Sequence, residues 1–105
     1  MRPKAGERFR AIRDTPVHGV ITLQAPGSSG FIGTLPRGEI VTVEKDPPSH
    51  ATGVYARPER YEEMADLLVP PSDRASPLYG SYTLVISFDS LKQDFEVVTT
   101  FGVRP

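Results

Sequence analysis

The stretch that decides the fold runs from residue 37 to residue 58 and reads RGEIVTVEKDPPSHATGVYARP. Its first part, EIVTVEK at 39–45, is rich in β-branched residues and predicts a strand with apolar side chains on both faces, which places it in the middle of a sheet. The DPP sequence at 46–48 ends that strand, because proline cannot donate a hydrogen bond to the ladder. The loop at 49–53 then leads into a short strand at 54–57. Ordinary strand and turn chemistry therefore accounts for the whole stretch.

The N-terminal part of the chain predicts two more strands and an extended piece. Polar and apolar residues alternate at 7–13 until Ile12 breaks the period, which is typical of a strand. VHGVITL at 17–23 predicts a second strand, which Gly19 weakens. The composition of QAPGSSG at 24–30 is that of a loop. The extended piece FIGTLPRG at 31–38 closes in a turn, where proline suits a fixed φ angle and glycine a positive one.

The C-terminal third shows the most regular alternation and predicts a hairpin. SYTLVISF at 81–88 is the first strand, DSLKQD at 89–94 the turn, and FEVVTTF at 95–101 the returning strand. The large side chains expected on one face are Tyr82, Leu84, Ile86, Phe88, Phe95, Val97 and Phe101. Burying each contributes about 2 kcal/mol, so this hairpin should be a main source of stability.

One helix is predicted, over residues 58–68. Pro58 suits the first helical position, and three glutamates near the start favour the positive end of the helix dipole. An apolar stripe at i, i+3, i+4 and i+7 indicates one buried face. The stripe consists of Tyr61, Met64, Ala65 and Leu68. The following segment, 69–80, is expected to be a long irregular connection.

Composition limits the class of protein. The 105 residues suit one domain with one core, and eleven prolines with nine glycines favour short elements joined by turns. We therefore predict a mainly β fold, either a small barrel or a strongly bent antiparallel sheet of five to six short strands with one short helix. The absence of cysteine excludes disulfides and thiolate chemistry. No apolar run approaches the roughly 20 residues of a membrane span, and no signal-peptide pattern is visible, so we expect a cytoplasmic protein without a membrane partner.

Charge is distributed unevenly. Residues 1–13 hold five basic and one acidic residue, which gives +4, whereas the remainder holds seven basic and twelve acidic residues, which gives −5. A basic first strand could contact phosphates. The alternative, which we favour, is an edge strand whose charges discourage pairing with other chains.

The segment GFIGTLPRGEIVTVEKD at 30–46 resembles the entry into the second strand of SH3-like barrels, where a turn of the Leu-Pro-(Lys/Arg)-Gly-Glu type precedes an alternating valine strand. This resemblance implies a single SH3-like barrel domain over residues 1–105. The chain has no tryptophan, so the indole that defines the proline-peptide groove of SH3 domains is missing. The resemblance is thus to the barrel and not to its best-known ligand.

The quoted stretch 37–58 is also similar to the opening of endoribonuclease toxins from bacterial toxin–antitoxin pairs. The shared pattern is Arg-Gly-(Asp/Glu)-Ile-Val, Asp-Pro, a glycine-containing loop and Arg-Pro. This resemblance implies a role in RNA cleavage for Arg57, whose guanidinium is suited to stabilising the phosphorane charge. The toxins continue with a hydrophobic strand ending in a hydroxyl residue, whereas this chain continues with ERYEEMADLL.

The function we predict is a small non-enzymatic module that engages a protein partner, or a copy of itself, through loops 24–30, 46–53 and 69–80 at the barrel mouth. The side chains predicted to bind are Tyr55, Arg57, Tyr79 and Tyr82. An alternative for the three tyrosines is that they complete a core lacking tryptophan.

Two other functions stay open: an RNA-cleaving barrel that uses Arg57, and a subunit of a larger phage- or plasmid-type assembly that pairs through strand edges. Nucleic acid is a possible partner that we do not favour. No cofactor is expected. His18 and His50 lie far apart without cysteines, so no metal site is predicted.

Overall fold

The computed structural model describes residues 2–24 and 27–99. Its strands are β1 (Arg8–Ala11), β2 (Thr15–Leu23), β3 (Ser28–Leu35), β4 (Ile40–Val43), β5 (Gly53–Pro58), β6 (Tyr79–Ser87) and β7 (Phe95–Val98). Its helices are α1 (Tyr61–Leu68), α2 (Pro71–Arg74) and α3 (Phe88–Asp94). The strands form one antiparallel sheet in the order β3-β2-β6-β5-β4-β1-β7.

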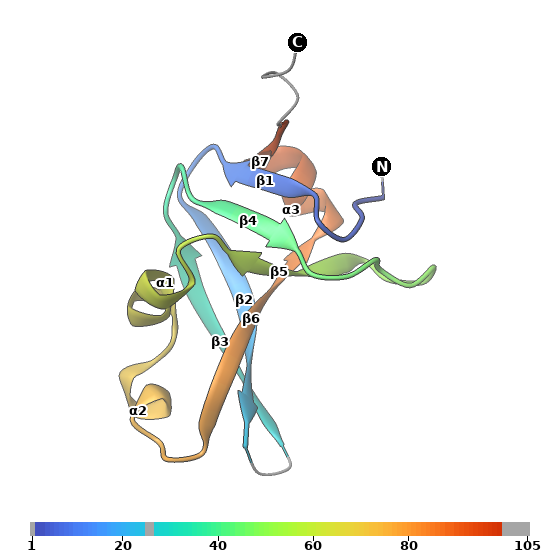
Figure 1. Cartoon of the computed structure of the whole chain (residues 1–105). Coiled ribbons are helices and arrows are strands. Elements are labelled where there is room, and N and C mark those ends of the chain that lie inside the picture. Colours follow the sequence, from blue (N-terminus) through green and yellow to red (C-terminus); the bar gives the residue numbers. More distant parts are fainter. Residues whose placement is uncertain (1, 25–26, 100–105) are drawn as a thin grey trace.

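The predicted mainly β class is confirmed, in the form of a bent sheet. The long strands β2, β3 and β6 run down the molecule, and the short strands β1, β4 and β7 cross near its top (Figure 1). Within the described residues β3 and β7 are at opposite ends of the strand order and do not close a barrel. The sheet has seven strands where five to six were predicted, and the extended piece at 31–38 is one of them, since residues 31–35 belong to β3. Residues 28–30 and 79–80, which were assigned to loops, lengthen β3 and β6 at their starts.

The stretch 37–58 folds as predicted. β4 lies between β5 and β1, and the side chains of Val41 and Val43 are buried on one face. The turn before it places Gly38 at φ +93°, a conformation that favours glycine. The main-chain N–H of Arg37 donates to Asp14 Oδ1 over 2.9 Å, which fastens this turn to the start of β2.

The predicted C-terminal hairpin is wrong. Residues 88–94 form helix α3, and the Ser87 hydroxyl caps it by accepting a hydrogen bond from the Ser90 N–H at 3.1 Å. Because a helix reorients the chain more than a tight turn does, β6 pairs with β2 and β5, whereas β7 pairs with β1. The two strands of the supposed hairpin are at different places in the sheet.

The faces predicted for these two strands are partly confirmed. Tyr82, Leu84 and Ile86 are buried on one face of β6. Among the remaining members of the predicted face, Phe88 is half-buried at the start of α3, Phe95 is buried, Val97 is 55% exposed, and Phe101 lies outside the described residues.

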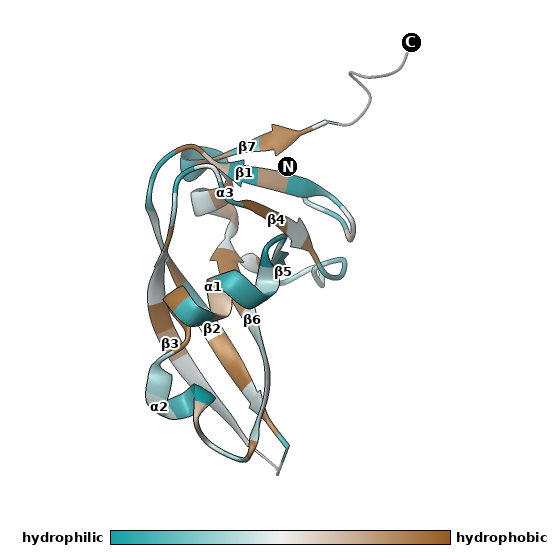
Figure 2. Cartoon of the chain, turned by 60° about the vertical axis from the view of Figure 1, so that its left-hand side comes forward, coloured by the Kyte–Doolittle hydropathy of each residue, from teal (hydrophilic) through white to brown (hydrophobic). Residues whose placement is uncertain are grey.

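The predicted helix begins at Tyr61, because Pro58 belongs to β5, where it lies opposite Val41. Its stripe is confirmed, since Met64, Ala65 and Leu68 are buried. The ribbon of α1 changes between hydrophilic and hydrophobic colours in Figure 2, as expected for a helix with one buried face. The segment 69–80, expected to be irregular, contains the short helix α2 and the first residues of β6.

The core fills one face of the sheet, which we call the inner face. Two glycines on this face leave room for large side chains of the core to pack against the main chain. The Phe31 ring lies over Gly19 on the neighbouring strand, and a β-carbon at Gly19 would stand 2.1 Å from the ring. Leu68 of α1 similarly lies against Gly33 of β3. The weak strand position that Gly19 seemed to be is therefore a packing requirement.

Candidate binding groove

Four side chains form a row across the opposite face of the sheet, which we call the outer face. Ile32 of β3 lies opposite His18 of β2, His18 lies opposite Val85 of β6, and Val85 lies opposite Tyr55 of β5. Ile32 is 70% exposed, Tyr55 is 42% exposed, and Val85 is half-buried. The row is therefore an accessible band of apolar and aromatic surface.

The loop between β4 and β5 stands beside this row and encloses a pocket of about 420 Å³. The residues that line the pocket are His18, Lys45, Asp46, Pro47, Pro48, Ala51, Thr52, Gly53, Val54, Tyr55, Val85 and Ser87. Most are apolar or present apolar atoms, with a few polar groups among them. This composition is typical of ligand pockets.

Two smaller hollows adjoin this pocket on the same face. One of about 340 Å³ shares Lys45 and Tyr55 with it and extends to Val20 and Thr83. The other, of about 80 Å³, shares His18, Val85 and Ser87 and extends to Pro16. Because neighbouring hollows share walls, the three form one depression across the strands, which we call the groove.

The wall of the groove is held in place from the N-terminal segment. The Arg2 guanidinium donates hydrogen bonds to the carbonyls of Pro47 and Pro48, the latter at 2.6 Å. The N–H of Ala5 donates to Asp46 Oδ1 at 2.8 Å. The conformation of the proline loop is thus fixed by contacts from far along the chain, which favours a preformed site.

Tyr55 lines both of the larger hollows of the groove. The Lys45 ammonium lies 5.1 Å from the centre of the Tyr55 ring, within the range of a cation–π interaction. The N–H of Glu44 donates to the Tyr55 carbonyl at 2.9 Å. The main chain of Tyr55 is therefore fixed, while its ring stays partly open to solvent.

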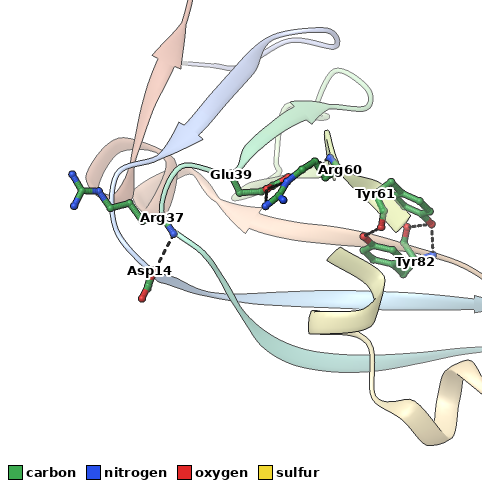
Figure 3. A network of polar contacts seen from close by, with 6 residues as sticks. All are labelled: Asp14, Arg37, Glu39, Arg60, Tyr61 and Tyr82. Atoms are coloured by element: carbon green, nitrogen blue, oxygen red, sulfur yellow. Dashed lines mark hydrogen bonds and ion pairs between the residues drawn. The ribbon is translucent and has the colours of Figure 1, made fainter. Parts of the chain in front are cut away.

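Tyr82, predicted to bind, lies in the core. It is 3% exposed, and its ring stacks on that of Tyr61 with centroids 4.3 Å apart (Figure 3). Its N–H donates to the Tyr61 hydroxyl oxygen at 2.8 Å, and this hydroxyl donates to the Tyr82 carbonyl at 2.9 Å. The Tyr82 hydroxyl donates to the Tyr61 carbonyl at 2.7 Å, and burial raises the pKa of Tyr82. For this residue the alternative of a core role is confirmed.

Arg57 is exposed and near this tyrosine pair. Its guanidinium carbon lies 4.0 Å from the centre of the Tyr61 ring. A second arginine, Arg60, pairs with a carboxylate: Glu39 is buried and accepts hydrogen bonds from the Nε–H and the main-chain N–H of Arg60 (Figure 3). The Glu39–Arg60 pair was missed from the sequence, where a Glu at the start of a strand and an Arg before a helix carried no sign of contact.

The three predicted loops do not form one surface. The end of β2 and the start of β6 lie side by side at the lower end of the molecule in Figure 1. Next to them, the Gln24 N–H of the first predicted loop donates to the Leu78 carbonyl of the segment 69–80 at 2.7 Å. We call this end the tip. Tyr79 is half-buried at the tip, and burial raises its pKa. Loop 46–53 lies away from the tip, beside Tyr55.

The basic N-terminal segment meets acidic side chains of the rest of the chain. Ion pairs join Arg8 to Glu59 at 2.7 Å, Arg10 to Glu96 at 3.0 Å and Arg13 to Asp94 at 3.6 Å. The charge asymmetry of the sequence is thus largely compensated within the fold. The predicted edge strand is wrong, because β1 lies between β4 and β7 in the sheet. The basic side chains of the segment pair with acidic side chains of the same chain, which favours a structural role over phosphate binding.

Within residues 2–24 and 27–99, no three His, Asp or Glu side chains are grouped so as to hold a metal ion. No helix in that part of the chain has the length and apolar character needed to cross a membrane. His18 lies in the groove and His50 in the neighbouring loop. No family model, curated protein or solved structure matches the chain.

Proposed function

We propose that this protein is a non-enzymatic binding module that holds an extended segment of a protein partner in the groove on the outer face. The observation that carries the proposal is the continuity of three hollows through shared residues, with Tyr55 lining the two larger ones. A cysteine-free module of this kind needs no oxidising compartment, which supports a cytoplasmic location.

The chemistry of the groove suits a peptide. Tyrosine offers a large apolar area together with a hydrogen-bonding hydroxyl, and it is enriched among the residues that dominate binding energy. Lys45 and Asp46 add one positive and one negative charge at the same wall, and His18 adds a hydrogen-bonding imidazole. An apolar floor with a few polar groups at its rim is the arrangement that orients a bound segment.

The proposal is tested by selecting ligands from a random peptide library and measuring their dissociation constants. Peptides selected on the wild-type protein should bind the Tyr55→Ala and Val85→Asp variants at least about tenfold more weakly, a loss of about 1.4 kcal/mol. Leu78→Ala is the matched control, since Leu78 is 45% exposed but lies at the tip. Equal affinity for wild-type and groove variants would refute the proposal.

A cleavage assay separates this function from the RNA-cleaving alternative. Structured RNA incubated with the pure protein should remain intact. Cleavage that disappears in the Arg57→Ala variant would replace the binding module with a ribonuclease, because contaminating nucleases would not respond to that substitution.

A further inference from the structure

We propose that β3 pairs with β3 of a second copy of this chain, so that two sheets join edge to edge around a two-fold axis. The argument rests on the direction of the main-chain groups of β3, on its composition, and on the way its side chains match their own copies. It is independent of the groove and of what the groove binds.

The direction of the main-chain groups follows from the ladder. In an antiparallel sheet, the N–H and C=O of successive residues point to opposite sides of the strand. The main-chain N–H and C=O of Tyr55 point toward β4, because its carbonyl accepts the Glu44 N–H. The main-chain groups of Ala56 therefore point toward β6, and those of its partner Leu84 point back toward β5. Tyr82, two residues earlier, also points to this side, as its bonds to the Tyr61 hydroxyl show.

The same alternation reaches the end of the sheet. Val85 follows Leu84, so its main-chain groups point toward β2, and those of its partner His18 point back toward β6. The main-chain groups of the next residue of β2, Gly19, then point toward β3, where its partner is Phe31. Ile32 consequently directs its N–H and C=O away from β2, at the end of the strand order. Ile32 itself is 70% exposed.

The composition of β3 does not protect this edge. Strand edges in monomeric proteins are usually short or carry charged residues or proline that prevent pairing with other chains. β3 has eight residues, SSGFIGTL, without a charge or a proline. The strand at the other end of the order, β7, has four residues, FEVV, and carries Glu96. Of these two, β3 is the one suited to pairing.

The side chains of β3 complement their own copies. In the two-fold register centred on Ile32, the exposed outer-face residues of β3 match their copies: Ile32 lies opposite Ile32, and Gly30 lies opposite Thr34 of the second copy. The glycine thus faces a β-branched residue, a type of side chain that stabilises cross-strand pairs in sheets. The two Ile32 residues form a hydrogen-bonded pair with Cα atoms about 5.5 Å apart. A neutral, self-matching strand favours a second copy over an unrelated partner.

Sedimentation velocity over a range of protein concentrations tests the proposal. The wild-type protein should form a dimer, and Ile32→Lys should shift it to monomer with an unchanged circular dichroism spectrum. Val97→Lys is the matched control on β7, at a side chain that is 55% exposed, and should stay dimeric. A wild-type protein that is monomeric throughout, or a dimer lost in Val97→Lys and kept in Ile32→Lys, would overturn the proposal.

A single introduced cysteine tests the register without relying on a disruptive charge. The chain has no cysteine of its own, so Ile32→Cys leaves one thiol per copy. A Cα separation of about 5.5 Å is within the range of a disulfide, and mild oxidation should yield a covalent dimer. Leu78→Cys at the tip should remain largely monomeric. Equal cross-linking of the two variants would contradict pairing through β3.

Discussion

Tyr55 and Tyr82 are on neighbouring strands and are surrounded in opposite ways. Tyr82 is 3% exposed on the inner face, where its ring stacks on that of Tyr61 and three hydrogen bonds join the two residues. Tyr55 is 42% exposed on the outer face, where it lines a pocket of about 420 Å³. The same residue type contributes to stability on one face and to an open surface on the other. Four predictions probe this difference.

The largest effect is expected at Ile86, which is 2% exposed on the inner face. Ile86→Asp should prevent folding, because the free energy needed to bury an unpaired carboxylate exceeds the free energy of unfolding of a small domain. Val85→Asp, one residue away on the outer face, should fold with a loss of about 1 kcal/mol. Circular dichroism and urea unfolding distinguish the two. A folded Ile86→Asp protein would show that the inner face is not the core.

The next effect is expected at Gly19, where the Phe31 ring occupies the space of a β-carbon. Gly19→Ala should lower the free energy of unfolding by about 1–3 kcal/mol, because the ring must move within a packed core. Gly30→Ala is the control on the adjacent strand, where the nearest atom to the added carbon would be 3.7 Å away. Chemical denaturation of both variants measures the difference, and equal stabilities would contradict the packing described.

A smaller effect is expected from removing one hydroxyl. Tyr61→Phe leaves the N–H and C=O of Tyr82 without their partner and should lower the free energy of unfolding by about 1–3 kcal/mol. Tyr55→Phe removes a hydroxyl from the outer face and should change it by no more than about 0.5 kcal/mol. Urea denaturation compares them. A Tyr55→Phe loss as large as that of Tyr61→Phe would remove the distinction between the faces.

The smallest effect should appear at high pH. Burial raises the pKa of Tyr82, so the folded state holds this proton more tightly than the unfolded state does. The stabilisation is complete below the ordinary tyrosine pKa of about 10 and is lost as the pH rises above it. Urea midpoints should therefore fall above pH 10 more steeply in the wild-type protein than in Tyr82→Phe. Parallel curves would show that Tyr82 does not contribute.

The periodicity of apolar residues was sufficient to predict single strands and helices. The alternation at 39–45 and the stripe from Met64 to Leu68 each report one strand or helix face, and both are confirmed. The partner of a strand depends on how the intervening segment turns. Residues 88–94 were taken for a turn, although Ser87 caps a helix there.

The candidate site was less predictable, for a similar reason. The burial of Tyr82 was visible in its alternation with Leu84 and Ile86, which placed all three on one face. The groove was not visible, because it depends on contacts from Arg2 and Ala5 that fix a loop more than forty residues away. Such long-range contacts leave no periodic signal in the sequence.

The most direct test of the account is amide chemical-shift mapping with a peptide selected on the wild-type protein. The outer-face account predicts that the perturbed amides cluster along the groove, at His18, Lys45, Tyr55 and Val85. Residues of the tip and of α2 should keep their shifts. Perturbations concentrated around Tyr79 and loop 24–30, with the groove unchanged, would contradict it.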